Sequence, residues 1–460
     1  MRRLHYIFAL ILLLVPAVVR AQFFVTGDDP GRLRWNYMDT DSYRIIYPRG
    51  ADSLAFFYGT QLEKYKFPVS RTTGYVTGLG DGRLMPVVMH TYNTSNGSVA
   101  WAPKRMDLFT VPSAYDPEPI PWPSMLAVHE SRHVTQMQFG MTRTLKPFNY
   151  VFGEMFNILV SLVYPGMYFI EGDAVVAETA LTRSGRGRTA DFLNYYMVAF
   201  DQGDMRNWNR WLYGSQWHYT PNHYALGYMT LGTFRYLHDY PDVMHDGYDR
   251  ASRIVFDFSP IQTMMKRKAG VKKFKQVFRE VQDTMKGIWT AEIEARAPFI
   301  SGEQVAEGDR LYTDYRNNIA VGTDIYSIKS GFMTTPVLVR IDSTGREHKV
   351  SRFASQTSVI RPSASQGRIY WSESLPDERW SMKSDSRIRY IDPSQSARKK
   401  NLTDRKDLLF NPSPSGDGFM VAAVLYHPEG GSALALRKTY EGGSDSMFAA
   451  PDSVQLLETA

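Results

Sequence analysis

Residues 129 to 133 read His129-Glu-Ser-Arg-His133, in a segment with the spacing of an α-helix. Side chains four positions apart lie on one helix face, so both imidazoles can reach one ion. Glu130 stands beside them, placed to take a proton from water. Catalytic zinc uses such neutral imidazoles together with one open coordination position. The alternative is a pair of surface histidines on an ordinary helix.

The flanking residues 121 to 140 are typical of a helix that contributes to a core. Residues that favour a helix start come first, apolar residues at helical spacing follow, and a glycine ends the segment. These are Pro121, Pro123 and Ser124, then Leu126, Val134 and Met137, and finally Gly140. The sequence therefore predicts that both histidines and Glu130 share one ordered helix.

A third ligand is expected downstream. A longer form of the motif has a glycine and a third histidine where this chain has Gln136 and Phe139, so that form is excluded. Instead, the stretch Tyr168-Phe-Ile-Glu171-Gly-Asp-Ala-Val-Val-Ala-Glu178 opens a second predicted helix. Glu171 can complete a His2Glu site, and Glu178 can hold a ligand histidine from behind. The alternatives are a first-turn Glu171 that complements the helix dipole, and a surface Glu178.

This set of residues resembles the gluzincin zinc metallopeptidases, which include the aminopeptidase N-like and thermolysin-like enzymes. The resemblance implies an α+β, zincin-like catalytic domain, with a small N-terminal sheet and a helical subdomain, spanning residues 22–297. It also implies Zn²⁺ as the cofactor, with His129, His133 and Glu171 as ligands. The interval from His133 to Glu171 is longer than in those enzymes, and a helical insert from Lys146 to Val163 would account for it.

Two further segments resemble parts of that family. His218-Tyr-Thr-Pro-Asn-His-Tyr-Ala-Leu-Gly227 matches its Tyr-x4-Tyr-x2-Gly segment, which implies that Tyr224 stabilises the oxyanion, with Tyr219 nearby. The alternative is two aromatic core residues. Ser95-Asn-Gly-Ser-Val-Ala-Trp101 is a candidate for the edge strand that pairs with a substrate backbone. No Gly-x-Met-Glu-Asn segment for binding a free amine is visible, which leaves endopeptidase activity open.

The apolar run from Phe148 to Val163 contains Glu154 and Asn157 and is followed by Pro165. A run of this length with polar residues is expected to form a buried core helix rather than a membrane span. Further along, Gly270 to Ile293 has the pattern of a final amphipathic helix, while one helix near Ser53 to Lys66 is expected within the N-terminal sheet region.

The N-terminus has the pattern of a secretory signal peptide over residues 1–21. Arg2 and Arg3 precede an apolar run from Ile7 to Val19, and Val19-Arg-Ala21 supplies small residues for cleavage before Gln22. The run is too short to span a bilayer comfortably, so no transmembrane segment is expected after its removal. A periplasmic or secreted location follows. The sequence has no cysteine, so stability is expected to come from packing.

The formal net charge of +6 is small for 460 residues, and basic residues are interleaved with acids. A solvated surface is therefore favoured over nucleic-acid binding. The expected partner is a peptide or protein substrate.

Residues 298–460 return to short strands separated by turns. Ile319, Ile369 and Phe419 lie 50 residues apart, and each is predicted to begin a short apolar strand, which is typical of β-propeller blades. An ordinary β-sandwich is the alternative. Three blades cannot close a ring, so the blades are expected to be incomplete. Asn401-Leu-Thr-Asp404 and the following Asn411 to Gly418 resemble the propellers of periplasmic Tol-system proteins.

The sequence as a whole predicts an exported zinc peptidase in which Glu130 is the general base. Two alternatives stay open. One is a catalytically vestigial binding or scaffold protein of the cell envelope that uses its propeller region. The other keeps the fold and the zinc but hydrolyses a substrate other than peptide.

Overall fold

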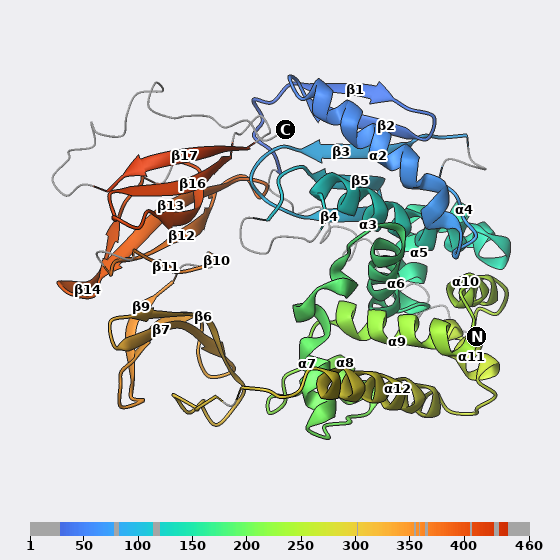
Figure 1. Cartoon of the computed structure of the whole chain (residues 1–460). Helices are drawn as coiled ribbons and strands as arrows, with labels where there is room; N and C mark the ends of the chain where they lie inside the picture. The colour runs from blue at the N-terminus through green and yellow to red at the C-terminus, as the bar shows by residue number, and fades with distance from the viewer. Residues whose placement is uncertain are drawn as a thin grey trace, which may run out of the picture.

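A computed structural model describes residues 28–77, 82–113, 120–300, 302–353, 356–357, 359–363, 367–404, 407–426 and 432–439. The predicted signal peptide lies outside these residues. Figure 1 shows an N-terminal mixed sheet, a helical middle region and a set of C-terminal antiparallel sheets. The predicted α+β class is confirmed.

The N-terminal sheet has five strands in the order β1-β2-β3-β5-β4. They are β1 (Trp35–Asp39), β2 (Tyr43–Pro48), β3 (Met85–His90), β4 (Gly97–Trp101) and β5 (Lys104–Phe109). The central strands β2, β3 and β5 run parallel, whereas β1 and β4 are antiparallel to their neighbours. The strand proposed to pair with substrate, β4, is therefore an edge of the sheet.

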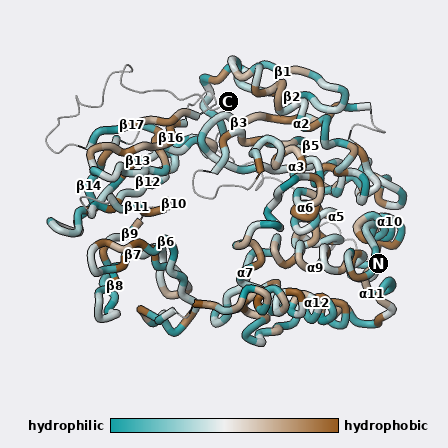
Figure 2. The backbone as a smooth tube through the Cα atoms, in the orientation of Figure 1, coloured by the Kyte–Doolittle hydropathy of each residue, from teal (hydrophilic) through white to brown (hydrophobic). Residues whose placement is uncertain are grey.

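One face of this sheet is covered by α2 (Asp52–Ser70) and α3 (Trp122–Met137), which share a core with it. On β2, Tyr43, Ile45 and Tyr47 are buried in that core. β3 is one of the hydrophobic stretches of the chain in Figure 2, as expected for a strand paired on both sides. The predicted helix near Ser53 is confirmed by α2.

The middle region is helical and has its own core. Its helices are α4 (Lys146–Phe152), α5 (Glu154–Val163), α6 (Met167–Leu181), α7 (Ala190–Asp201), α8 (Trp208–Tyr213), α9 (His223–His238), α10 (Val243–Arg253), α11 (Pro260–Lys268) and α12 (Phe274–Ala295). The predicted final amphipathic helix corresponds to α12, whose Val277, Phe278 and Val281 are buried. α3 and α6 lie between the sheet core and the helical core.

The apolar run from Phe148 to Val163 does not form one buried helix, so that prediction is wrong. Gly153 has φ +67° and separates α4 from α5. No residue of α4 is buried, and α5 exposes Leu159, Leu162 and Val163. The length and hydropathy of this run correctly predicted helical structure, but they did not predict which side chains of α4 and α5 face the protein. Among the described residues no single helix is long and apolar enough to cross a membrane; α5 and α6 meet that test only together, with an 87° bend between them.

Three antiparallel sheets make up the C-terminal region. The first is β6 (Thr313–Val321), β7 (Asp324–Gly331), β8 (Val337–Ile341) and β9 (Glu347–Arg352). The second is β10 (Gln356–Thr357), β11 (Arg361–Pro362), β12 (Ile369–Pro376), β13 (Ser384–Asp392) and β14 (Ser396–Asn401). The third is β15 (Leu409–Pro414), β16 (Met420–Tyr426) and β17 (Ser432–Lys438).

These sheets stack in chain order. Leu338 of the first sheet packs with Trp371 of the second, and Ile388 of the second packs with Val421 of the third. The described residues show no closed propeller ring. The predicted repeat holds for Ile369, which begins β12, and Phe419, which precedes β16. It is wrong for Ile319, which lies near the end of β6, because the equivalent second strand of the first sheet begins at Asp324.

The C-terminal region contacts both preceding regions. Asn93, which follows β3, exchanges two hydrogen bonds with the backbone of Ser384. Tyr219, which precedes α9, stacks on Tyr312 with ring centroids 4.1 Å apart. The sheet region and the helical region are therefore each joined to the stacked sheets.

His90, at the end of β3, connects the beginning of the described chain to the sheet. Its Nδ1 lies 2.6 Å from Asp29 Oδ2, and its Nε2 lies 3.1 Å from Asp107 Oδ1. Burial acts to lower the pKa of His90, but the hydrogen bonds to Asp107 and Asp29 outweigh it and raise the pKa from 6.5 to about 9. The stabilisation of the folded protein by protonated His90 is therefore complete below about pH 6.5, and it is lost as the pH rises through about 9.

We expect His90→Gln to lower the free energy of unfolding by about 2 kcal/mol at pH 6, with a difference that shrinks above pH 9. Denaturant unfolding at pH 6, 7.5 and 9.5 measures this. The matched control is His238→Gln, because the pair that His238 forms with Glu280 is partly solvent-exposed. Equal stability of parent and His90 variant at pH 6 would contradict the expectation.

Candidate metal centre

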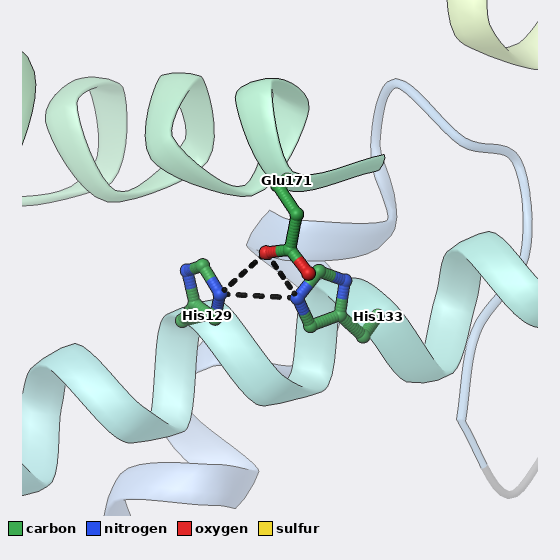
Figure 3. A group of neighbouring side chains, drawn as sticks. All are labelled: His129, His133 and Glu171. Atoms are coloured by element: carbon green, nitrogen blue, oxygen red, sulfur yellow. Dashed lines mark hydrogen bonds and ion pairs between the residues drawn. The ribbon is translucent and has the colours of Figure 1, made fainter. Parts of the chain in front are cut away.

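His129, His133 and Glu171 converge at the junction of α3 and α6. Figure 3 shows both imidazoles rising from α3 and the carboxylate of Glu171 descending from α6 between them. The two Nε2 atoms lie 3.0 Å apart, and Glu171 Oε2 lies 3.3 Å from His129 Nε2 and 3.2 Å from His133 Nε2. All three side chains are buried. The insert between the motifs thus does not prevent Glu171 from reaching the histidines.

These separations suit one tetrahedral ion. Zn–N and Zn–O bonds of roughly 2.0–2.2 Å at tetrahedral angles place the ligand atoms about 3.3 Å from one another. The three separations in the protein lie close to that value. The three residues form a group that could hold a metal ion, and zinc is the ion that their donor set favours.

The orientation of His133 is fixed by Gln136, one turn further along α3. The Gln136 amide nitrogen donates to Ile170 O at 3.0 Å and to Asp173 Oδ2 at 2.7 Å. The amide oxygen therefore faces His133 Nδ1, 2.8 Å away, and accepts a hydrogen bond from the Nδ1–H group. The Nε2 of His133 then carries a lone pair, as a metal ligand requires.

His129 is oriented in the same way by Glu178. His129 Nδ1 lies 2.6 Å from Glu178 Oε1, and Arg186 donates to both oxygens of the same carboxylate, with its Nη2 3.0 Å from His129 Nδ1. Burial acts to raise the pKa of Glu178, but its hydrogen bond and charge interaction with His129, together with Arg186, lower it to about 2. An ionised Glu178 accepts a hydrogen bond from the Nδ1–H of His129, so the Nε2 of His129 also presents a lone pair.

Two lone pairs and a carboxylate oxygen facing one another require a cation among them. A proton is one such cation: despite burial, hydrogen bonds with Glu171 and Glu178 raise the pKa of His129 to about 9. The imidazoles of His133 and His129 hold the pKa of Glu171 far below its usual range, although burial opposes this shift. A proton joins only two atoms, whereas a metal ion satisfies three. The residues therefore fit a divalent metal.

Glu130 lies beside the three ligands and is buried. Burial raises its pKa, although the charges of His129 and His133 oppose the shift. Its Oε2 has no hydrogen-bond partner among the described residues, which leaves it available to a water or a substrate. A side chain at Gly97 of β4 would put its Cβ 2.3 Å from Glu130 Oε1, so glycine is what allows the edge strand to lie against this carboxylate.

Tyr224, in the first turn of α9, also reaches the site. Its ring lies parallel to that of His129 with centroids 6.2 Å apart, and the Arg186 guanidinium lies 5.3 Å from its centroid. Burial, followed by the charge of Glu171 and a hydrogen bond to it, raises the pKa of Tyr224 well above the usual range, so the hydroxyl is a proton donor. Tyr219 lies elsewhere: its ring contacts are with Tyr195 and Tyr312.

A close approach of α6 and α9 places Tyr224 beside Glu171. A Cβ at Gly172 would lie 2.3 Å from the backbone carbon of Gly227, and a Cβ at Gly227 would lie 1.7 Å from Tyr168 O. Only glycine at both positions lets the two backbones meet at this distance. The glycines that follow Glu171 and Tyr224 in the two motifs therefore have a packing role.

The sequence interpretation did not assign three residues that hold the site together: Gln136, Asp173 and Arg186. Gln136 had a weak signal, since it lies three residues after His133 and so near the same face of α3; Asp173 had less, because it lies two residues after Glu171 and so on another side of α6. Arg186 had none, because it lies in a short 3₁₀ turn at Arg186–Arg188 and reaches Glu178 only through the fold. No protein-family model matches this chain, and no curated protein matches it either.

We expect Gly172→Ala to lower the free energy of unfolding by about 1–3 kcal/mol, because the new methyl group overlaps the α9 backbone. Zinc affinity should also fall, since α6 must shift and take Glu171 with it. Chemical denaturation and a competitive zinc titration measure both. Gly232→Ala in α9 is the control, because its Cβ meets nothing within 4 Å. A Gly172 variant as stable as the Gly232 variant would refute the packing role.

Glu178→Gln tests the orientation of His129. The amide is a weaker acceptor and can present its NH₂ group to Nδ1, so we expect zinc affinity to fall roughly 10–100-fold. Titration against a chromophoric chelator measures the change. Glu280→Gln, at an exposed position, is the control. Unchanged affinity in the Glu178 variant would show that this carboxylate does not support the ligand.

Proposed function

We propose that this chain is a zinc-dependent peptidase in which Glu130 is the general base. One observation carries the proposal: a buried carboxylate, with an oxygen that has no partner among the described residues, lies beside three converging metal ligands and against Gly97 of an edge β-strand. The carboxylate and the metal ligands suit activation of water. The edge strand suits a substrate that is itself an extended polypeptide.

A zinc ion held by His129, His133 and Glu171 would supply Lewis acidity, polarising a carbonyl group and lowering the pKa of water. Glu130 accepts a proton from the attacking water, whose oxygen bonds to the scissile carbonyl carbon. The carbon–nitrogen bond then breaks, and Glu130 delivers the same proton to the departing amine. The buried position of Glu130 suits both steps, because a raised pKa makes the carboxylate a better proton acceptor.

Negative charge that develops on the carbonyl oxygen needs a donor. The Tyr224 hydroxyl, held near His129 and Glu171, fits that role as an oxyanion donor. Arg186 lies against the Tyr224 ring and binds Glu178, so it positions both the tyrosine and the ligand His129.

The free edge of β4 favours peptides over other substrates. Among the described residues β4 pairs with no strand but β5, so its other edge offers backbone N–H and C=O groups for pairing. Gly97 lies against Glu130, so the backbone of a peptide that pairs with β4 would lie near the general base.

We also propose that the protein is exported, on the pattern of residues 1–21, and that its C-terminal sheets are propeller-type blades. The support for blades is the stacking of consecutive antiparallel sheets around shared apolar cores.

The test is hydrolysis of an unfolded protein mixture and of quenched fluorescent peptides by the zinc-loaded chain. We expect Glu130→Gln to lower kcat/KM by at least about 10³-fold while one zinc per chain is retained. Tyr224→Phe should lower kcat by roughly 10²-fold with little effect on KM.

Zinc content measured on the same samples is the control that separates loss of metal from loss of the base. A Glu130→Gln variant as active as its parent would sink the peptidase proposal. Retention of zinc without hydrolysis of any peptide in the parent chain would instead favour a binding protein or a different hydrolase.

A further inference from the structure

An apolar surface lies on the insert that separates the two metal-binding motifs. Its members are large apolar side chains that are exposed on α4, on α5 and on the segment after α10. They are Phe148, Tyr150, Val151, Phe152, Leu159, Leu162, Val163, Phe256 and Phe258. Tyr150 is 79% exposed, Val151 74% and Phe256 87%. We call this set the insert surface.

α5 is apolar on both sides. Its inward face buries Val160 together with Asn157 and Ser161, whereas Leu159, Leu162 and Val163 face outward. The side-chain polar atoms of Asn157 and Ser161 have no hydrogen-bond partner among the described residues. A helix on the surface of a protein in water places polar residues on its outward face. The exposed leucines and valine of α5 depart from that pattern and suit contact with an apolar medium.

The parts of the insert surface form one continuous unit. Phe156 of α5 stacks on Phe148 and Phe152 of α4, with ring centroids 5.5 and 6.3 Å apart. Tyr164, after α5, stacks on Phe258 at 6.0 Å, and its hydroxyl donates to Val255 O. α4, α5 and residues 254–258 therefore present their exposed side chains together. A patch of this kind marks an interaction site.

Basic residues border the insert surface. Arg143 precedes α4, Lys146 begins it, and Arg253 ends α10; all three are exposed. Two acids lie near them: Asp249 is paired with both Arg143 and Arg253, and Asp257 is paired with a further base, Arg250. The Lys146 ammonium lies 5.9 Å from the ring centroid of Tyr150, at the margin of the apolar side chains. The border thus carries positive charge.

We propose that the insert surface docks on the surface of an anionic lipid bilayer. The aromatic and aliphatic side chains of α4 and α5 enter the boundary between headgroups and acyl chains, while Arg143, Lys146 and Arg253 contact the phosphate groups. The insert surface would thus bind two parts of the bilayer, the layer of anionic headgroups and the apolar interior beneath it. The protein lies on the bilayer and does not span it, because the next helix, α6, is buried in the protein and carries Glu171.

Docking of the insert surface on a bilayer does not require peptidase activity. A bilayer is favoured over a protein partner because α4 has no buried residue and so projects from the surface, and because a basic border complements anionic lipids. A protein partner, or a second copy of this chain, would instead bury the same side chains against a matching apolar face.

The test is flotation of the full mature chain with large unilamellar vesicles of phosphatidylcholine, with and without 30 mol% phosphatidylglycerol as a probe composition of about physiological anionic content. We expect roughly tenfold stronger binding to the anionic vesicles at low salt, most of it lost at high salt. The triple variant Tyr150→Ser, Val151→Ser, Phe256→Ser should bind at least about tenfold more weakly. Lys146→Glu should weaken binding to anionic vesicles alone.

The matched control is Ile300→Ser with Met333→Ser, which removes two exposed apolar side chains from the region after α12. It should bind vesicles as the parent does, and a thermal midpoint shows that each variant is folded. Absence of vesicle binding by the parent, equal binding by the triple variant, or parent self-association that the triple variant abolishes without vesicles would each overturn the proposal.

Discussion

The Asp173 carboxylate is the charge on which the arrangement of the metal centre depends. It lies fully buried on α6 and accepts from Arg132 Nε at 2.7 Å, Gln136 Nε2 at 2.7 Å and Arg235 Nη2 at 2.8 Å. Burial acts to raise the pKa of Asp173, but Arg132 and Arg235 lower it to about 2. One side chain thereby joins α3, α6 and α9. Removing one partner of such a buried pair typically costs about 3–5 kcal/mol.

The same carboxylate acts on the chemistry through Gln136. By accepting from the amide nitrogen, Asp173 turns the amide oxygen toward His133 and so determines which ring nitrogen of His133 is free. Arg132, which stands inside the His129–His133 motif, points away from the metal and into this junction. The motif thus has two faces, one that could hold a metal ion and one that fixes α3 against α6 and α9.

The local chemistry of the site could be predicted from the sequence because it depends on helical periodicity. His129, Glu130 and His133 share one turn of helix, and Glu171 and Glu178 share one face of the next motif-bearing helix, as spacing alone required. Packing between distant segments could not be predicted in this way. The direction in which α5 faces, and the reach of Arg186 to Glu178, depend on contacts that no local pattern encodes.

In the C-terminal region, too, local structure could be predicted from the sequence, whereas the exact spacing of the sheets could not. Turn residues and apolar alternation predicted short strands, and their stacking could be expected from a repeat. The register of the first repeat was wrong because the interval between equivalent strands differs from sheet to sheet. β7 and β12 begin 45 residues apart, whereas β12 and β16 begin 51 residues apart.

The two attachments of the stacked sheets, at Asn93 and at Tyr219, have a mechanical consequence. The metal ligands come from α3, which shares the sheet core, and from α6, which leads into the helical core. Any hinge motion that widens the angle between those cores must also bend the stacked sheets or separate the ring of Tyr219 from that of Tyr312. The C-terminal region thus limits how far the two cores can move apart at the junction that carries His129, His133 and Glu171.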